Sequence, residues 1–417
     1  MQNKRILVVT IPEKGHINPM IGIAQHLQAA GFELFFFAQQ DISAQLQKAG
    51  LHQKVYSDPA SVNIKEDFVT RGKAFVEHLA NKPWLRSWIK TLLIDAVPEQ
   101  VRLLTAVAED CRPSLIVTDP MIYAAAITAA HLGIPWVGLS SSLNPVTPDD
   151  WHCELTETLD AFQVQREQLF VAHGLPPRFK VSDAVSPWLN LVFSTEEYMP
   201  RNICGNDFSF YIGHSFPLHN RGDEAPFPFE RLQPNTRKVY MSMGSQIYYH
   251  PQLFIAVAGA LAEEKNLQLI IAINELCNSE FSETWPKNVI AVPYAPQLKL
   301  LPSMDLVITH GGANSVMESL ANSVPVAMLP ICNDQFLQAK FITRAGVGIV
   351  LDPTNPSPEI YREQLLPLLR PESAERRNAR VIGQSFFQHG GAGEAAALIE
   401  RLYETGKPVY PGGGVAP

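Results

Sequence analysis

The chain has 417 residues, which at roughly 150 residues per domain predicts two large domains or three small ones. Acidic residues number 41 and basic residues 33, so the formal net charge is −8 at pH 7. This balance argues against a nucleic-acid-binding or anionic-membrane-binding protein, which needs a basic face. Hydrophobic residues make up 46% of the chain, enough for sizeable cores and too much for a disordered protein.

The sequence carries no sign of a targeting or membrane-spanning segment. The N-terminal apolar run at residues 6–11 is too short for the core of a signal peptide. The longest apolar region, residues 115–143, is interrupted by Asp119, His131 and Pro135, which is not typical of a transmembrane helix. The cysteines show no Cys-x-x-Cys spacing and are expected to be reduced and buried. We therefore expect a cytoplasmic protein without an integral membrane segment.

The first half alternates short apolar strands with helical patterns. A strand at residues 6–11, a helix at 20–30 and a strand at 33–38 form a βαβ unit, which indicates a parallel sheet. Strands at residues 115–118 and 135–139 continue this series. Residues 60–105 and 147–190 do not follow the rhythm and are predicted to be helical insertions.

The second half repeats this opening after a linker rich in proline and glycine. A strand at residues 238–243, a loop at 244–246 and a helix at 253–261 are followed by four further strands, at residues 268–273, 289–292, 306–309 and 324–329. The predicted fold class is α/β, with two Rossmann-like doubly wound domains. The predicted parts are an N-terminal domain, a linker, a C-terminal domain, and a C-terminal helix and tail that pack back on the N-terminal domain: 1–213, 214–236, 237–392 and 393–417.

The segment from Asp305 to Leu320 carries the most informative motif. A buried strand ends at Thr309, two glycines permit a sharp turn, and a helix follows whose free N–H groups and dipole favour an anion. Asn314 and Ser315 add donors, and Glu318 is placed to accept from vicinal hydroxyls such as those of a ribose. Taken alone, the same residues are equally typical of an ordinary helix cap and turn.

Two neighbouring segments favour a nucleotide site. The segment 294–297, Tyr-Ala-Pro-Gln, follows one strand and offers an aromatic face for a base. The segment 330–335 follows another strand and brings together the carboxylate of Asp334 and the amide of Gln335, groups that bind sugar hydroxyls. Both lie beyond the carboxyl ends of strands, where ligands bind in open α/β sheets.

The run from Tyr294 to Gln335 resembles the donor-binding signature of the UDP-glycosyltransferase superfamily. That signature is an aromatic-Ala-Pro-Gln, a His-x-Gly-x-Asn-Ser with Glu four residues after Asn, a Val-Pro and a closing Asp-Gln. Residues 15–19, Gly-His-Ile-Asn-Pro, are similar to the family's opening, so the resemblance covers the whole chain. Ala313 stands where plant members usually carry Trp, which makes the chain more similar to bacterial macrolide- and carotenoid-modifying relatives.

The resemblance implies a GT-B architecture, in which the two Rossmann-like domains face each other across a cleft. It also implies that the enzyme is inverting and moves a hexose, glucose being expected, from a UDP-sugar to a hydroxyl of a lipophilic small molecule. Tyr294 would stack on the base, Glu318 would hold the ribose, and Asp334 with Gln335 would hold the sugar. The implied donor-binding residues are Ser242, Gly244, Ser245, Tyr294, Gln297, His310, Gly312, Asn314, Ser315, Glu318, Asp334 and Gln335.

His16 and Asp119 are the candidate catalytic residues. His16 is expected in a loop close to the N-terminus of the first helix, where the dipole favours the neutral imidazole that a general base needs. Asp119, after the strand at 115–118, is placed to orient that ring. From the residues alone, His16 is more typical of a capping or solvent histidine, and Asp119 is equally typical of a helix cap. The resemblance favours the catalytic pair.

The remaining expectations concern ligands. The sequence contains no Asp-x-Asp pair, so no metal and no bound cofactor are expected, and the UDP-sugar would be a co-substrate. The partners would be this donor and a lipophilic acceptor. The acceptor is expected to contact apolar residues of the insertions and of nearby loops, although domain packing is a close competitor as their role: Phe75, Trp84, Trp88, Leu143 and Trp151.

Two alternative functions stay open at this point. One is a sugar-nucleotide epimerase, which shares the two-domain architecture but has little use for an acceptor pocket. The other is a catalytically silent auxiliary protein of the same fold. A dinucleotide oxidoreductase is disfavoured, because no Gly-x-Gly-x-x-Gly follows either opening strand.

Overall fold

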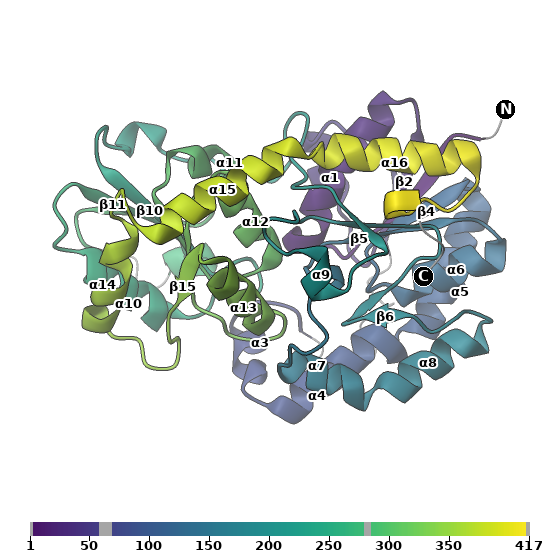
Figure 1. Cartoon of the computed structure of the whole chain (residues 1–417), viewed down its shortest axis with the longest axis horizontal. Coiled ribbons are helices and arrows are strands. Elements are labelled where there is room, and N and C mark those ends of the chain that lie inside the picture. The colour runs from purple at the N-terminus through teal and green to yellow at the C-terminus, as the bar shows by residue number, and fades with distance from the viewer. Residues whose placement is uncertain (1–2, 58–68, 279–284, 414–417) are drawn as a thin grey trace. The chain divides into compact units, whose positions relative to one another are not determined.

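The computed structural model describes residues 3–57, 69–278 and 285–413, which form two compact α/β units (Figure 1). The first unit comprises Met1–Val69, Asn81–Gly222 and Gln388–Pro417, and the second comprises Thr70–Ala80 and Asp223–Phe387. The main boundary between the units therefore falls inside the segment that the sequence indicates as a linker.

The first unit is built on a parallel sheet of seven strands within the described ranges. In spatial order the strands are β3 (Lys54–Ser57), β2 (Glu33–Ala38), β1 (Arg5–Val9), β4 (Leu115–Thr118), β5 (Trp136–Ser140), β8 (Leu189–Val192) and β9 (Ser209–Tyr211). A separate antiparallel pair is formed by β6 (Phe179–Lys180) and β7 (Asp183–Ala184). The strand order reverses between β1 and β4, where Val9 lies opposite Thr118.

The second unit repeats this plan with six parallel strands within the described ranges. In spatial order they are β12 (Val289–Val292), β11 (Leu267–Ala272), β10 (Arg237–Ser242), β13 (Leu306–Thr309), β14 (Val326–Met328) and β15 (Gly348–Val350). Its order reverses between β10 and β13, where Ser242 lies opposite Thr309. The two doubly wound parallel sheets confirm the predicted fold class.

Helices surround both sheets. Those of the first unit are α1 (Lys14–Ala29), α2 (Ser43–Lys48), α4 (Lys82–Lys90), α5 (Val97–Cys111), α6 (Tyr123–Leu132), α7 (Glu154–Ala161), α8 (Gln163–Ala172), α9 (Arg201–Cys204) and α16 (Gly391–Thr405). Those of the second unit are α3 (Gly72–Leu79), α10 (Pro251–Leu261), α11 (Gln297–Leu300), α12 (Ala313–Ala321), α13 (Gln335–Ala345) and α14 (Pro358–Leu368), and α15 (Ala374–Gln388) ends at the unit boundary. None of the helices in the described ranges has the length and apolarity needed to cross a membrane.

The central strands are buried on both faces, which is why they are continuous apolar runs. All four residues of β4 and of β13 are buried, as expected for central strands that helices cover on both sides. The C-terminal helix α16 completes the first core: it packs along α1 (Figure 1), with Ala395, Ile399 and Leu402 almost inaccessible to solvent. Val409, after this helix, is buried in the same core and its amide donates to the Trp188 carbonyl (2.8 Å).

One segment of the first half groups with the second unit. The sequence predicts α3 within the N-terminal domain, whereas residues 70–80 cluster with residues 223–387. The Gly72 amide donates to the Gln246 carbonyl (2.9 Å), and the Gln246 side chain donates back to the Thr70 carbonyl (3.1 Å). These reciprocal hydrogen bonds attach the start of α3 to the loop after β10.

Candidate active site

The predicted catalytic residues and part of the predicted nucleotide-binding set lie at the two points where strand order reverses. In the first sheet His16 follows β1 and Asp119 directly follows β4. In the second sheet Gly244 follows β10 and His310 directly follows β13. At such a point the connections from two neighbouring strands run to opposite faces of the sheet. The loops at the carboxyl ends of these strands therefore leave a crevice in which ligands bind.

The structure brings His16 and Asp119 together within the first unit. His16 Nδ1 lies 2.7 Å from Asp119 Oδ2, and Ser141 Oγ lies 2.8 Å from the same nitrogen and donates to the same oxygen at 2.6 Å. The second carboxylate oxygen, Oδ1, accepts from the Met121 amide (3.0 Å). Asp119 is 1% exposed and His16 is 25% exposed, so the pair has a buried anchor and a ring that solvent reaches.

The charge state of Asp119 suits this arrangement. Burial of the carboxyl acts to raise its pKa, but the charge of His16 and hydrogen bonds from His16, Ser141 and the Met121 amide outweigh that effect. The pKa of Asp119 therefore lies below its ordinary value, and the group is ionised at neutral pH. An ionised carboxylate at Nδ1 fixes the orientation of the ring and favours the tautomer with its proton on that nitrogen.

His16 lies in the first turn of α1, not in the loop that the sequence predicts. Gly15 and Pro19 have low helix propensity, which makes this stretch look like a loop. Burial of Ile17 and Ile21 in the core of the unit outweighs that propensity, so the helix begins at Lys14.

In the second unit, His310 is held between two glycines. Gly244 has a φ of +76°, and a Cβ built there would lie 2.5 Å from His310 Cε1. A Cβ at Gly312 would lie 2.7 Å from His310 Nε2. Desolvation lowers the pKa of His310 to about 4, although a hydrogen bond to the Ser242 backbone acts in the other direction. His310 is therefore neutral at pH 7 and can donate a hydrogen bond without carrying charge.

The helix that follows has a buried carboxylate in its second turn. Glu318 is 0% exposed; its Oε1 accepts from Asn314 Nδ2 (2.8 Å) and its Oε2 from Gln297 Nε2 (2.6 Å). These contacts join α12 to the start of α11, so three predicted donor-binding residues form one hydrogen-bonded group. No side chain caps α12 at Gly312, so the helix presents backbone N–H groups and the positive end of its dipole, as a phosphate site requires.

The other predicted donor residues border these loops. The Tyr294 side chain is 45% exposed, and Ser242 Oγ accepts from the Gly244 amide (3.2 Å). Asp334 is partly buried at the N-cap of α13. Gln335 is 6% exposed, and its side-chain Oε1 accepts from the Ile331 amide (2.7 Å). This side chain therefore stabilises the loop that precedes it.

The predicted acceptor residues are divided between the two units. Phe75 lies on α3 of the second unit and is 2% exposed, and Leu143, in the first unit, is 1% exposed. Trp84 and Trp88 on α4 stack with ring centroids 6.4 Å apart, and Trp88 Nε1 donates to the Val69 carbonyl (2.9 Å). These two rings are partly exposed, as is Trp151, so the tryptophans are the members of this set that present surface to a ligand.

Sequence reasoning missed three polar residues at these sites. Ser141 bridges the His16–Asp119 pair, Asp183 holds the loop on which Ser141 lies, and Asn274 in the second unit donates to the Gly244 carbonyl (3.2 Å). A signal existed for Ser141, because the run Ser140-Ser141-Ser142 follows a third strand at the same edge of the sheet. Asn274 also follows a strand, β11, with a left-handed φ of 52°.

Metal ligands do not gather in the described part of the chain. Among those residues no group of three His, Cys, Asp or Glu side chains is placed to hold a metal ion.

Comparison with known proteins identifies the family. The glycosyltransferase family 28 C-terminal domain matches residues 249–391, and the erythromycin biosynthesis protein CIII-like N-terminal domain matches residues 25–195. The chain belongs to these family 28 and erythromycin CIII-like glycosyltransferases. The resemblance predicted from the motifs is confirmed, and the protein is a glycosyltransferase that depends on a nucleotide sugar.

Relatives and solved structures match along almost the entire chain. The uncharacterized UDP-glucosyltransferase YdhE of Bacillus subtilis is 24% identical over 410 residues, covering 96% of this chain and 98% of the relative. The zeaxanthin glucosyltransferase of Pantoea ananas is 24% identical over 433 residues and covers 97% of each. The glycotransferase of kitacinnamycin superposes with a TM-score of 0.74 at 20% identity, over 95% of this chain and 98% of the other. VinC in complex with dTDP superposes with a TM-score of 0.68 at 19% identity, over 96% and 99%. These likenesses confirm the GT-B fold.

Proposed function

We propose that the protein is an inverting glycosyltransferase that moves a hexose, glucose being expected, from a UDP-sugar to a hydroxyl of a lipophilic small molecule. The observation that carries this proposal is the 2.7 Å contact between His16 Nδ1 and the ionised Asp119. Small-molecule acceptors are in keeping with relatives such as the zeaxanthin glucosyltransferase.

The chemistry is a single displacement at the anomeric carbon. With its proton on Nδ1 facing Asp119, neutral His16 takes the acceptor proton on Nε2 while the acceptor oxygen bonds to the anomeric carbon. The bond from that carbon to the diphosphate oxygen breaks, and the charge moves onto the diphosphate. Asp119 stabilises the imidazolium so formed and need not become protonated itself.

The second unit supplies the leaving-group site in this scheme. The diphosphate lies at the N-terminus of α12 near Asn314 and Ser315, with neutral His310 as a donor. Glu318 holds the ribose, exposed Tyr294 stacks on the base, and Asp334 with Gln335 and the Ser242–Ser245 loop faces the sugar. Trp84, Trp88 and Trp151 of the first unit contact the apolar body of the acceptor.

Comparing the binding of UDP and dTDP tests which nucleotide sugar this site takes as donor. UDP carries two vicinal ribose hydroxyls, whereas dTDP, the ligand bound in the VinC structure, lacks the 2′-hydroxyl. If Glu318 accepts from both hydroxyls, wild type binds UDP more tightly than dTDP. Glu318→Ala should then lower UDP affinity roughly tenfold or more and dTDP affinity less, since a hydrogen bond to a charged group contributes about 1.5–3 kcal/mol.

Calorimetry with both nucleotides provides the measurement. The control is Glu263→Ala, which removes an exposed carboxylate of the same unit and should leave both affinities unchanged. Unchanged UDP affinity in Glu318→Ala would reject the ribose assignment. Equal losses for UDP and dTDP would show that the 2′-hydroxyl is not recognised.

Activity is tested with purified protein, UDP-glucose and a panel of apolar alcohols and phenols, followed by mass spectrometry. A product heavier than an acceptor by one hexose supports the proposal. Conversion of the UDP-sugar in the absence of any acceptor would indicate an epimerase. Nucleotide binding with no product from any donor and acceptor would indicate an auxiliary protein.

A further inference from the structure

A second buried carboxyl lies beside the His16–Asp119 pair. Asp183, the first residue of β7, is 3% exposed. Its Oδ2 accepts from Ser140 Oγ at 2.5 Å, and its Oδ1 accepts from Asn144 Nδ2 at 2.6 Å. Both donors are neutral, so these two bonds do not neutralise the carboxylate as an ion pair would. A buried carboxyl of this kind next to a catalytic pair is a candidate for a functional role.

The two hydrogen bonds hold both ends of the segment that carries Ser141. Ser140 ends β5 and Asn144 begins the short helix Asn144–Val146, so Asp183 fixes the chain on either side of Ser141. Ser141 in turn contacts His16 and Asp119. We propose that Asp183 is a positioning residue that acts on the His16–Asp119 pair through the segment 140–144 and through the charge of its own carboxyl. This inference rests on the proposed function, because it assumes that His16 is the base.

The charges around Asp183 make its ionisation sensitive to pH near neutrality. Burial and then the negative charge of Asp119 raise the pKa of Asp183 to about 7, while the bonds from Ser140 and Asn144 and the charge of His16 act to lower it. Around neutral pH the Asp183 carboxyl therefore changes between its neutral and ionised forms.

Other charged groups face Asp183 from the neighbouring elements. On α6, the Tyr123 hydroxyl lies close enough to Asp183 for the negative charge of that carboxyl to raise the pKa of the phenol. The same hydroxyl accepts from the Arg166 guanidinium of α8 (3.2 Å). On β6, the ammonium of Lys180 lies 2.5 Å from the exposed Asp149 carboxylate. Lys180 thus has a carboxylate partner other than Asp183.

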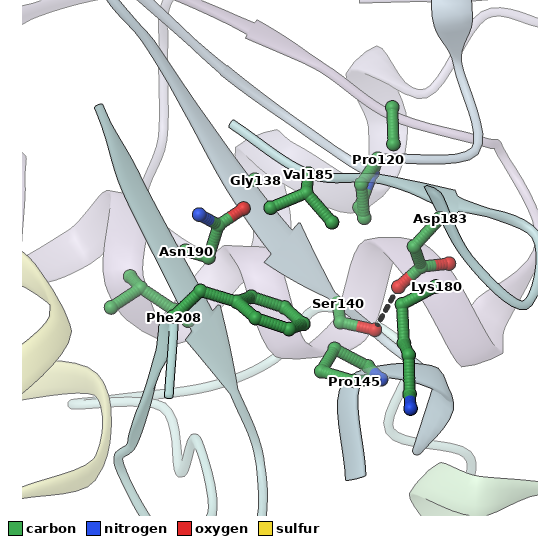
Figure 2. A pocket seen from close by; sticks show the side chains of 11 residues that line it. Pro120, Gly138, Ser140, Pro145, Lys180, Asp183, Val185, Asn190 and Phe208 are labelled. Atoms are coloured by element: carbon green, nitrogen blue, oxygen red, sulfur yellow. Dashed lines mark hydrogen bonds between the residues drawn. The ribbon is translucent and has the colours of Figure 1, made fainter. Parts of the chain in front are cut away.

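A small pocket borders Asp183 (Figure 2). Ser140 and Asp183 line it together with apolar residues such as Val185 and Phe208. The space that a water-sized sphere can reach in it is about 10 Å³, whereas pockets that bury a drug-sized ligand usually span about 300–1,000 Å³, so this pocket is too small for a whole acceptor.

The two protonation states make different hydrogen bonds. Ionised Asp183 accepts from both Ser140 and Asn144. The Asn144 amide nitrogen only donates, so the proton of the neutral acid must lie on Oδ2, and the Ser140 hydroxyl must turn to accept it. Asp183→Asn reproduces this neutral state, since its amide nitrogen can donate to Ser140 while its oxygen accepts from Asn144.

The test is the pH dependence of kcat/KM for a hydroxyl acceptor in wild type and Asp183→Asn. At low pH kcat/KM falls because the base His16 becomes protonated, and this part of the profile is the acid limb. Ionised Asp183 favours the protonated imidazole of His16. In wild type the two coupled ionisations therefore broaden the acid limb and extend it to higher pH. In Asp183→Asn the acid limb should become a steeper, one-proton curve and lie at lower pH by roughly half a unit. Val185→Ala, which trims the same pocket without touching the hydrogen bonds, should leave the limb in place.

A merely structural role predicts a different result. Loss of packing would lower kcat at every pH without moving the limb, and that outcome in Asp183→Asn would overturn the proposal. If Asp183→Asn does not fold, Ser140→Ala takes its place: it keeps the carboxyl but removes one donor, so the limb should move in the same direction by less. An unmoved limb in that variant would equally overturn the proposal.

The same measurements separate this inference from the proposed function. An unmoved acid limb in Asp183→Asn, together with a large loss of turnover in His16→Ala, would reject the role of Asp183 and keep His16 as the base. Wild-type turnover in His16→Ala would reject the base itself.

Discussion

The central strands β4 and β13 occupy corresponding places in the two units and carry nearly the same sequence. Leu115-Ile-Val-Thr118 is followed by Asp119, and Leu306-Val-Ile-Thr309 is followed by His310. Both strands pair with the first strand of their sheet, and both final threonines lie at the point where strand order reverses. The fold thus delivers one polar side chain to the same position twice.

The surroundings of these two side chains differ. Asp119 faces the His16 ring and the Ser141 hydroxyl, and these partners lower its pKa although burial acts to raise it. His310 faces Gly244 and Gly312, whose missing side chains let the ring approach the backbone closely, and desolvation lowers its pKa to about 4. One position is therefore charged at pH 7 and the other neutral.

The difference in charge makes the two positions suited to different chemical tasks. A charged carboxylate beside a partly exposed histidine suits proton transfer, because the imidazolium formed during the reaction is stabilised at once. A neutral imidazole at a helix N-terminus suits anion binding, because it donates a hydrogen bond and does not titrate near pH 7. Topology fixes where the side chains lie, and neighbouring residues fix what they do.

The largest expected effect comes from removing the histidine of the first unit. His16→Ala should lower kcat by about 10²- to 10⁴-fold, the usual contribution of a positioned general base, and leave UDP affinity unchanged. His52→Ala, which removes an exposed histidine of the same unit, serves as the control and should keep wild-type turnover. The acceptor must be an ordinary alcohol, because an acidic phenol needs little help to ionise. Near-wild-type turnover in His16→Ala would contradict the assignment of proton transfer to the His16–Asp119 pair of the first unit.

A smaller effect is expected from closing the space beside His310. Gly244→Ala places a methyl group about 2.5 Å from the ring in a backbone conformation with φ +76°, so the ring must move. Affinity for UDP should fall roughly 10- to 100-fold, whereas the acid limb of catalysis should stay in place. Gly50→Ala is the matched control: its φ is +77°, but nothing lies within 4 Å of the new Cβ. It should cost about 1–2 kcal/mol of stability with no loss of UDP affinity, and an equal loss in both variants would indicate backbone strain alone.

Local patterns in the sequence suffice for the central strands and indicate the nucleotide motif, whereas β3, β6, β7, β8, β9 and β15 were not predicted. The strands β2, β4, β12 and β13 begin and end where the apolar runs predict, because a strand buried on both faces must be apolar throughout. The polar residues just beyond them could be assigned to ligand sites for the same reason, since the carboxyl ends of parallel strands share one edge of the sheet. Asp119 and His310 were selected in this way, Glu318 by its place in the helix after β13, and His16 by the resemblance to the family.

The missed features depend on contacts between distant segments. Asp183 meets Ser140 across 43 residues and Ser141 meets His16 across 125, and nothing in either local pattern encodes the pairing. The grouping of α3 with the second unit likewise depends on backbone hydrogen bonds between residues near 70 and Gln246. Such contacts follow from packing of the complete fold.

The smallest expected effect concerns stability and the pH at which each unit loses it. The ordinary pKa of histidine is 6.5, and that of folded His310 is about 4. Between these values the unfolded chain takes up a proton that the folded ring excludes, so the free energy of unfolding falls as pH falls. One pKa unit corresponds to 1.36 kcal/mol, so at about pH 5 the loss from His310 should approach 2 kcal/mol. Asp119 behaves differently: its folded pKa is lowered from 3.8, so its contribution is lost only below about pH 4.

Urea denaturation at about pH 7.5 and pH 5 separates these contributions when wild type is compared with His310→Gln. The variant keeps a hydrogen-bonding side chain but cannot titrate, so wild type should lose more stability on acidification by up to about 2 kcal/mol. Other histidines with lowered pKa, such as His250, titrate in both proteins and cancel in the difference. A parallel decline in the two proteins would mean that His310 takes up its proton as readily in the folded protein as in the unfolded chain. The neutral donor would then be a cation at mildly acidic pH, and UDP would bind more tightly at pH 5 than at pH 7.5.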